Sequence, residues 1–209
     1  GIDRNRNAWW SDVLENGPSS VYAKYFDIDW TPPKEELSNQ VLLPVLGDQY
    51  GRALENGEIR VRYEPGRFVI EYADRRFPVA PQTWGALLEP ILETLRTREP
   101  SESQVMELES ILTALKHLPP PTEMDPERVR ERHREKEVIK RRLSTLTEAD
   151  AAIAETITAE VERINGRAGD PHSFDRLEAL LAQQVYRLCY WRVAVDEINY
   201  RRFFDVTEL

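Results

Sequence analysis

The chain of 209 residues contains a single cysteine, Cys189, so no disulfide can form within it. One thiol is typical of a reducing compartment, and we expect a cytoplasmic protein. No apolar run approaches the roughly 20 residues of a transmembrane helix, and no leader resembling a secretion signal is present. The histidines lack the spacing of metal ligands, so the sequence predicts no metal and no cofactor; they are His117, His133 and His172.

The chain also has fewer positively charged than negatively charged residues. The 28 lysines and arginines face 37 aspartates and glutamates, which leaves a net charge of −9. This balance excludes nucleic acid and anionic membranes as expected partners, because both require clustered positive charge. Binding of a neutral polysaccharide does not depend on this net charge. With 41% hydrophobic residues the chain can still form a core.

Regular β patterning is confined to a short part of the chain. The first fifty residues read as loops and turns rich in aromatics, with a short turn at 35–37 and a short helix at 48–54. Apolar residues alternate with charged ones over 59–63 and 68–72, and a third short strand follows at 77–79. This period of two predicts a three-stranded antiparallel meander.

The rest of the chain is predicted to be helical. A helix over 84–95 contains Pro90, which should kink or restart it, and a second runs from Ser101 or Ser103 until the prolines at 119–121. Asp125-Pro126 is a helix start, and a second start at Thr147 heads a helix that Asn165-Gly166 closes. These two helices predict a charged, protruding hairpin whose basic run, 128–142, forms a solvated face. A final helix is expected over 174–198, with its buried stripe ending at Leu188 and Trp191. The fold class is therefore α+β and mainly α-helical.

Aromatic side chains gather beside carboxylates in two blocks, 9–30 and 186–204. Flat aromatic rings stack on pyranose rings, and carboxylates accept hydrogen bonds from sugar hydroxyls. Of Trp9 and Trp10 we expect one to pack in the core and the other to contact a sugar. Asp27 and Asp29 face one side of an extended segment, but further oxygen ligands for calcium are not evident. The plainer alternative is that these rings only fill the core.

Three strings carry a family resemblance: WWSDVLENGPSSVYAKYFDIDW (9–30), VLLPVLGDQYG (41–51) and YRLCYWRVAVDEINYRRFF (186–204). Together they resemble maltooligosyltrehalose synthase, an isomerase of the α-amylase superfamily, in the family's own order. The resemblance implies that residues 1–209 are an excised insertion between the third strand and third helix of a (β/α)-barrel. Its expected sub-blocks are an aromatic segment (1–57), the meander (58–80), two helices (81–118), the charged hairpin (119–166), and a final helix with a return motif (167–209).

The same resemblance implies a function. Such enzymes convert the reducing-end α-1,4 linkage of a maltooligosaccharide to α,α-1,1, the activity of a (1→4)-α-D-glucan 1-α-D-glucosylmutase. The catalytic carboxylates are expected outside this chain, so the isolated segment should be inactive, with the glucan and the rest of the barrel as its partners. The candidate substrate contacts are Trp10, Asp29, Trp30, Asp48, Trp191, Asp196, Asn199, Tyr200, Arg201, Arg202 and Phe203.

Two other functions stay open from the sequence. One is a hydrolase or transglucosylase of the same superfamily that shares this insertion. The other is a self-contained helical interaction domain without a role in sugar chemistry, in which the charged hairpin is the binding arm. The return motif implies that both ends of the segment approach one barrel face, so Gly1 and Leu209 are expected to lie near each other.

Overall fold

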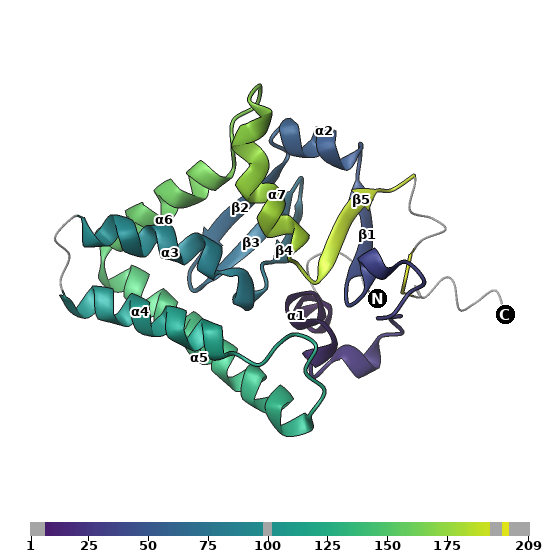
Figure 1. Cartoon of the computed structure of the whole chain (residues 1–209), viewed down its shortest axis with the longest axis horizontal. Coiled ribbons are helices and arrows are strands. Elements are labelled where there is room, and N and C mark those ends of the chain that lie inside the picture. The colour runs from purple at the N-terminus through teal and green to yellow at the C-terminus, as the bar shows by residue number, and fades with distance from the viewer. Residues whose placement is uncertain (1–6, 98–101, 193–197, 201–209) are drawn as a thin grey trace.

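The computed structural model describes residues 7–97, 102–192 and 198–200 (Figure 1), so the expected proximity of Gly1 and Leu209 lies outside the described residues. Within them the chain forms both sheets and helices. In chain order the elements are α1 (Ala8–Asn16), η1 (Gly17–Ser19), η2 (Ala23–Tyr25), η3 (Glu35–Leu37), β1 (Val41–Leu46), α2 (Tyr50–Glu55), β2 (Ile59–Glu64), β3 (Arg67–Tyr72), β4 (Arg75–Pro78), η4 (Pro81–Thr83), α3 (Gly85–Arg96), α4 (Glu102–His117), α5 (Pro126–Ala149), α6 (Ala151–Ile164), η5 (Pro171–Phe174), α7 (Asp175–Ala182) and β5 (Tyr186–Tyr190). The predicted class, α+β and mainly helical, is confirmed.

The predicted meander is present as the antiparallel sheet β2-β3-β4. Val61 pairs with Ile70, and Ile70 pairs with Phe77, so the three side chains lie in one row across the sheet. All three are buried, whereas the neighbouring Arg62 and Arg76 are exposed. The alternation in the sequence therefore reports the buried face of this sheet correctly.

A second sheet was not predicted. β1 and β5 pair in parallel, with Val41 opposite Tyr186 and Leu43 opposite Leu188. The expected helix over 174–198 is confirmed only for its first part: α7 ends at Ala182, and the chain then forms the strand β5. Apolar residues at 177, 180, 181, 185 and 188 fit a helix, but the pairing of β5 with β1 decides the outcome.

The first segment also differs from the prediction. Residues 8–16 were expected to be loop but form α1, which Asn7 caps by accepting hydrogen bonds from the amides of Trp9 (3.0 Å) and Trp10 (3.2 Å). An asparagine in this role satisfies amides that have no partner within the helix. The predicted turn at 35–37 and short helix near 50 are confirmed as η3 and α2.

The four longer helices lie on one side of the molecule (Figure 1): α6 and α5 contact β2 and β3, while α3 packs on α6 and α4 packs on α3 and α5. α3 continues through Pro90 without restarting. Asp125 caps α5 as predicted, but α6 begins after Asp150 and not at Thr147. The Thr147 hydroxyl instead bonds to the Leu143 carbonyl inside α5, at 3.1 Å.

The pair α5–α6 does not protrude. α5 packs against α4, and α6 packs against α3 and β2. Ile139 and Leu143 from α5, and Ile153 and Ile157 from α6, are buried in the same hydrophobic cluster that holds α1, both sheets and α7. Within the described residues, no helix has the length and apolar character required to span a bilayer.

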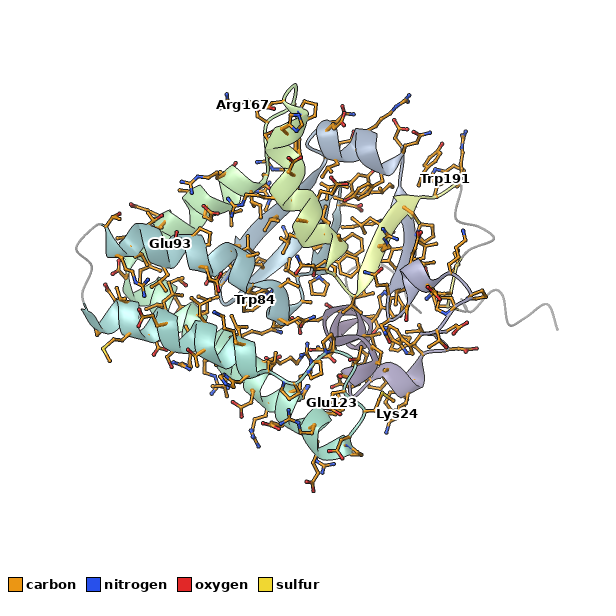
Figure 2. The ribbon with its side chains drawn as sticks, in the orientation of Figure 1. Lys24, Trp84, Glu93, Glu123, Arg167 and Trp191 are labelled. Atoms are coloured by element: carbon orange, nitrogen blue, oxygen red, sulfur yellow. The ribbon has the colours of Figure 1, made fainter. Side chains whose placement is uncertain are left out.

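Trp84 lies at the centre of that cluster and is fully buried (Figure 2). Its indole Nε1–H donates to the Val79 carbonyl at 2.9 Å, and its ring meets Phe68 edge-on at 5.5 Å between centroids. The buried polar atom of this large side chain is thus satisfied. The core therefore joins the helical layer to the edge where β1 and β5 lie.

Candidate functional site

Three segments that are distant in sequence meet beside β1. Ile28 forms an antiparallel bridge with Tyr200, and the Asp29 amide donates to the Asn199 carbonyl at 2.8 Å. The Asn39 amide donates to the Trp30 carbonyl at 2.8 Å. The aromatic block at 9–30 and the return motif near residue 200, which the sequence singled out separately, are therefore neighbours.

Asn199 lies at the centre of this junction. Its side-chain Oδ1 accepts from the Leu42 amide at 3.0 Å, and its Nδ2 donates to the carbonyls of Asp29 (2.9 Å) and Gln40 (2.7 Å). The residue is 8% exposed. Both amide hydrogens are used within the protein, so this side chain, which was predicted to contact substrate, holds main-chain segments together.

Tyr200 continues from Asn199 onto an aromatic group. Its ring lies 5.4 Å from that of Trp10, and Trp10 lies 5.1 Å from Phe26, both between centroids and with tilted planes. Such arrangements stabilise aromatic pairs beyond the area that they bury. Tyr200 is half-buried and keeps part of its surface open to a ligand.

The two neighbouring tryptophans have different environments. Trp10 is 8% exposed and belongs to the core, whereas Trp9 is 49% exposed and lies beside Tyr22 and Tyr25, at 5.1 and 5.2 Å between centroids. The expected division into one core and one surface ring is present, but the surface ring is Trp9. Trp10, the ring predicted to contact a sugar, packs against Phe26 and Tyr200.

Asp29 and Trp30 also differ from each other in exposure. The Asp29 side chain is exposed, and its Oδ1 accepts from the Thr31 amide at 3.0 Å. Trp30 is half-buried and packs on the core. Among the described residues no group of three or more His, Cys, Asp or Glu side chains is arranged to hold a metal ion.

Asp48 and Trp191 form a second group, where β1 and β5 end. The Trp191 amide donates to the Leu46 carbonyl at 3.2 Å, which places it beside the start of the Gly47-Asp48 turn. Trp191 is 50% exposed and points away from the body of the molecule (Figure 2), with the Arg192 guanidinium 5.1 Å from its ring centroid. Asp48 forms an exposed ion pair with Arg52 at 3.8 Å.

The candidate contacts thus fall into two groups and not one. Asp29, Asn199 and Tyr200 lie near the start of β1, and Asp48 and Trp191 lie beyond its end. A six-residue strand separates them by roughly 16 Å. The remaining candidates, Asp196, Arg201, Arg202 and Phe203, lie outside the described residues.

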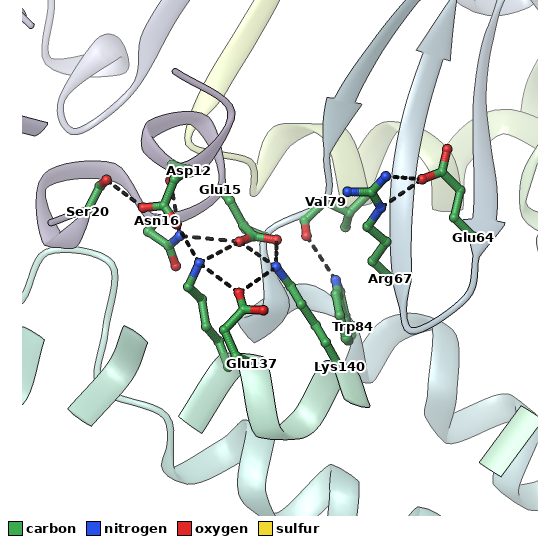
Figure 3. Close-up of polar contacts among 12 residues, drawn as sticks. Asp12, Glu15, Asn16, Ser20, Glu64, Arg67, Val79, Trp84, Glu137 and Lys140 are labelled. Atoms are coloured by element: carbon green, nitrogen blue, oxygen red, sulfur yellow. Dashed lines mark hydrogen bonds and ion pairs between the residues drawn. The ribbon is translucent and has the colours of Figure 1, made fainter. Parts of the chain in front are cut away.

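The sequence analysis missed a buried charge network between α1 and α5 (Figure 3). Lys136 is 2% exposed, and its Nζ lies 2.5 Å from the Asp12 carboxylate and 3.1 Å from that of Glu15. Lys140 adds a contact of 2.8 Å to Glu15. The expected solvated face on this helix is therefore wrong for Lys136 and for the neighbouring Arg132, which is 1% exposed.

The surroundings shift the pKa values of these groups. Burial alone would raise the pKa of Glu15, but the charges of Lys140 and Lys136 outweigh it and hold that pKa below 4.5. Burial would likewise lower the pKa of Lys136, yet Glu15 and Asp12 raise it above its ordinary value. For Arg132 burial dominates and lowers the pKa to about 10. Glu15 and Lys136 are thus ionised at neutral pH, and their ion pair fixes the aromatic block on the helical layer.

A polar pocket of about 460 Å³ opens between η3, the end of α7 and β5. Amide side chains form much of its lining, among them Asn39, Gln40 and Gln183, and Glu36 and Arg187 lie 3.9 Å apart at it. These groups can exchange hydrogen bonds with hydroxyls, but its lining contains no aromatic ring. It therefore lacks the stacking surface that the two aromatic groups provide.

No protein-family model matches the chain. A stretch of 76 residues is 40% identical to proteins described as maltooligosyl trehalose synthases in two strains of Mycobacterium tuberculosis, CDC 1551 / Oshkosh and H37Rv, and covers 36% of this chain and 8% of each relative. A solved structure, DSM5389 glycosyltrehalose synthase, aligns with 93% of this chain and 15% of its own, with a TM-score of 0.39 and 18% identity. The resemblance to this family is confirmed over a stretch of 76 residues, and that stretch spans only 8% of the length of these relatives.

Proposed function

We propose that this chain is part of a maltooligosyltrehalose synthase and forms one wall of its substrate pocket. The 40% identity to such synthases over 76 residues supports the family. The observation that carries the role is the junction of the aromatic block with the return motif, where Tyr200 meets Trp10 and Asp29 meets Asn199. The paired segments carry a half-buried tyrosine and an exposed carboxylate, two groups that suit a sugar ring and its hydroxyls.

The reaction explains why a wall is needed. Isomerisation of the terminal linkage releases a glucose unit, which must turn over and attack through its anomeric hydroxyl before water does. A retaining mechanism holds the other part of the glucan covalently during this time. The Asp nucleophile and the Glu acid/base belong, by the family resemblance, to barrel strands outside this chain. The segment then contributes exclusion of water and retention of the free sugar.

The residues of the junction receive specific roles in this proposal. Tyr200 is assigned a contact with the glucose that turns over, and the family resemblance assigns the same role to Arg201, Arg202 and Phe203. Asp29 accepts a hydrogen bond from one hydroxyl of that glucose. Trp30 supports the segment that carries Asp29. Asp48, Trp191 and Asp196 contact glucosyl units farther along the glucan, because Asp48 and Trp191 lie at the other end of β1.

The test uses the full-length enzyme that carries this segment, with maltopentaose as substrate. Tyr200→Ala and Arg201→Ala should each lower formation of the trehalose-ended product and raise the share of free glucose. Arg134→Ala is the control, because the Arg134 side chain is 70% exposed on α5, away from the junction. If both variants keep the wild-type product ratio, the wall has no part in the choice between isomerisation and hydrolysis.

The same assay separates the family alternative. A hydrolase or transglucosylase of the α-amylase superfamily would yield shorter or rearranged α-1,4 glucans without a trehalose end. Detection of a non-reducing, trehalose-ended product from the unmodified enzyme assigns the reaction. The 209-residue chain alone should leave maltopentaose unchanged, because it lacks the proposed catalytic carboxylates.

A further inference from the structure

At one edge of β1, the Asn199 side chain forms the hydrogen bonds that a neighbouring strand would otherwise form. On one side, the Val41 amide donates to the Val185 carbonyl at 2.8 Å, so β1 pairs toward β5. The next amide, that of Leu42, points to the other edge and donates to Asn199 Oδ1, while Asn199 Nδ2 donates to the Gln40 carbonyl. One side-chain amide thus satisfies both a donor and an acceptor of an open strand edge.

The same side chain also ties down the aromatic block. Its second Nδ2 hydrogen bonds to the Asp29 carbonyl at 2.9 Å, and the Asn199 carbonyl accepts from the Asp29 amide at 2.8 Å. Asp29 is therefore held on both sides of its α-carbon by one residue. The next residue, Tyr200, bridges to Ile28 and reaches the Trp10 ring.

We propose that Asn199 is a positioning residue that sets the placement of Asp29 and Tyr200 together, and through them the choice between isomerisation and hydrolysis. This inference rests on the proposed function. Asn199 contacts no substrate itself, since its amide is occupied by the protein and the residue is 8% exposed. A shift of Asn199 moves the sugar-facing carboxylate and the sugar-facing ring at the same time.

Only an asparagine meets the geometry of this junction. Oδ1 must accept from one amide while Nδ2 donates to two carbonyls. Aspartate keeps the size but has no hydrogen to donate, and it would place a carboxylate against two carbonyl oxygens in a site that water cannot easily reach. Alanine removes all three side-chain bonds and leaves the Leu42 amide unsatisfied.

The chain contains a matched control. Asn165 is also buried, and it occupies the open edge of β2 by accepting from the Val61 amide at 2.6 Å and donating to the Val61 carbonyl at 3.0 Å. It therefore makes the same kind of contact at a strand edge, between α6 and the meander. Loss of Asn165 should weaken the fold in a similar way without moving Asp29 or Tyr200.

Two measurements test the proposal, beginning with amide exchange in the 209-residue chain. Asn199→Ala should speed exchange at Leu42 by about two- to tenfold, the change expected when an amide loses one hydrogen bond of ordinary strength. Exchange at Asp29 should speed up to a smaller degree, because its amide keeps the main-chain carbonyl of residue 199 as acceptor while the bond to its own carbonyl is lost. Asn165→Ala should speed exchange at Val61 and leave Leu42 and Asp29 as in the wild type. Unchanged exchange at Leu42 and Asp29 in Asn199→Ala would show that Asn199 does not hold the junction.

The second measurement is the product ratio of the full-length enzyme. Asn199→Asp and Asn199→Ala should raise the share of free glucose several-fold while total cleavage of maltopentaose continues, and Asn165→Ala should not. A wild-type ratio in both Asn199 variants, in an enzyme where Tyr200→Ala does change it, overturns the positioning role and leaves the proposed function intact. An equal rise in Asn165→Ala overturns it too, since the effect would then follow general loss of stability. If the unmodified enzyme forms no trehalose-ended product, the proposed function itself fails, whatever the exchange rates.

Discussion

The rings of Trp10 and Tyr200 lie 5.4 Å apart between centroids, although the two residues stand near opposite ends of the chain. Trp10 belongs to α1, and Tyr200 follows directly on Asn199, which bonds to the edge of β1. The contact therefore joins the first described helix to the last described residues. A displacement of one segment therefore changes the packing of the other, because the two rings are in contact.

This contact predicts that the two adjacent tryptophans have unequal effects on stability. Trp10→Ala should lower the free energy of unfolding by about 3–5 kcal/mol, because it opens a cavity beneath Phe26 and Tyr200. Trp9→Ala removes an exposed ring and its contacts with Tyr22 and Tyr25, and should cost about 0.5–1.5 kcal/mol. Urea unfolding of the 209-residue chain measures both. Equal losses would mean that Trp10 is not a core residue.

The network between α1 and α5 gives a second prediction. Lys136→Met should destabilise the chain by about 3–5 kcal/mol, because it leaves the carboxylates of Asp12 and Glu15 buried without their central cation. The control is Arg67→Met, which removes a surface pair with Glu64 and should change stability by about 0–1 kcal/mol. Thermal unfolding followed by circular dichroism compares the two. A Lys136→Met chain as stable as wild type would show that the buried pairs contribute nothing net.

The same network predicts that the stability of the fold decreases at acidic pH. The folded-state pKa of Glu15 is lowered below 4.5, so its contribution is complete above that value and is lost as the pH falls through the folded-state pKa. Stability of the wild type should therefore decline below pH 4.5. Glu137 and Glu107, whose pKa values are also lowered, add to this decline.

Glu15→Gln isolates the contribution of that one carboxylate. The variant should be less stable than wild type at neutral pH, and its stability should fall less steeply below about pH 4.5, because one proton-linked group is gone. Denaturant unfolding at several pH values gives the two slopes. Parallel curves for variant and wild type would contradict the lowered pKa of Glu15.

Local patterns in the sequence predicted the elements that local physics determines. The alternation through Val61 and Ile70 gave the meander, and Asp125-Pro126 gave the start of α5, because face burial and capping depend on neighbours in the chain. The strand β5 was predicted as a helix because its apolar spacing fits both. Its pairing with β1 involves residues more than a hundred positions away, which no local pattern contains.

The candidate site likewise contains features that the sequence predicted and features that depend on contacts between distant segments. Residue type indicated Tyr200 and Trp191 as candidate aromatic contacts. It did not indicate that the Asn199 side-chain amide bonds to Leu42, Gln40 and Asp29. Lys136 and Arg132 lie in a basic run that is typical of a solvated helix face. Tertiary packing buries them: Lys136 pairs with α1, and Arg132 bonds to Asn16, Gln82 and the Pro119 carbonyl. The spacing of Asp12 and Glu15 on one helix, opposite Lys136 and Lys140 on another, is a signal that becomes visible once the two helices are known to touch.

The last prediction concerns the end of α6. Gly166 has a φ of +67°, and a Cβ there would lie 2.6 Å from the Phe174 ring. Gly57 has a similar φ of +70° but open space around it. Gly57→Ala should therefore cost only the strain of the left-handed conformation, about 1–2 kcal/mol.

Gly166→Ala should cost clearly more than Gly57→Ala, because the same strain is joined by a clash with a buried ring that has no free space to enter. Urea unfolding of the two variants under identical conditions measures the difference. A Gly166→Ala chain that loses no more stability than Gly57→Ala would mean that Phe174 moves aside without cost. In that case the connection from α6 into α7 is looser than the close contact between Gly166 and Phe174 indicates.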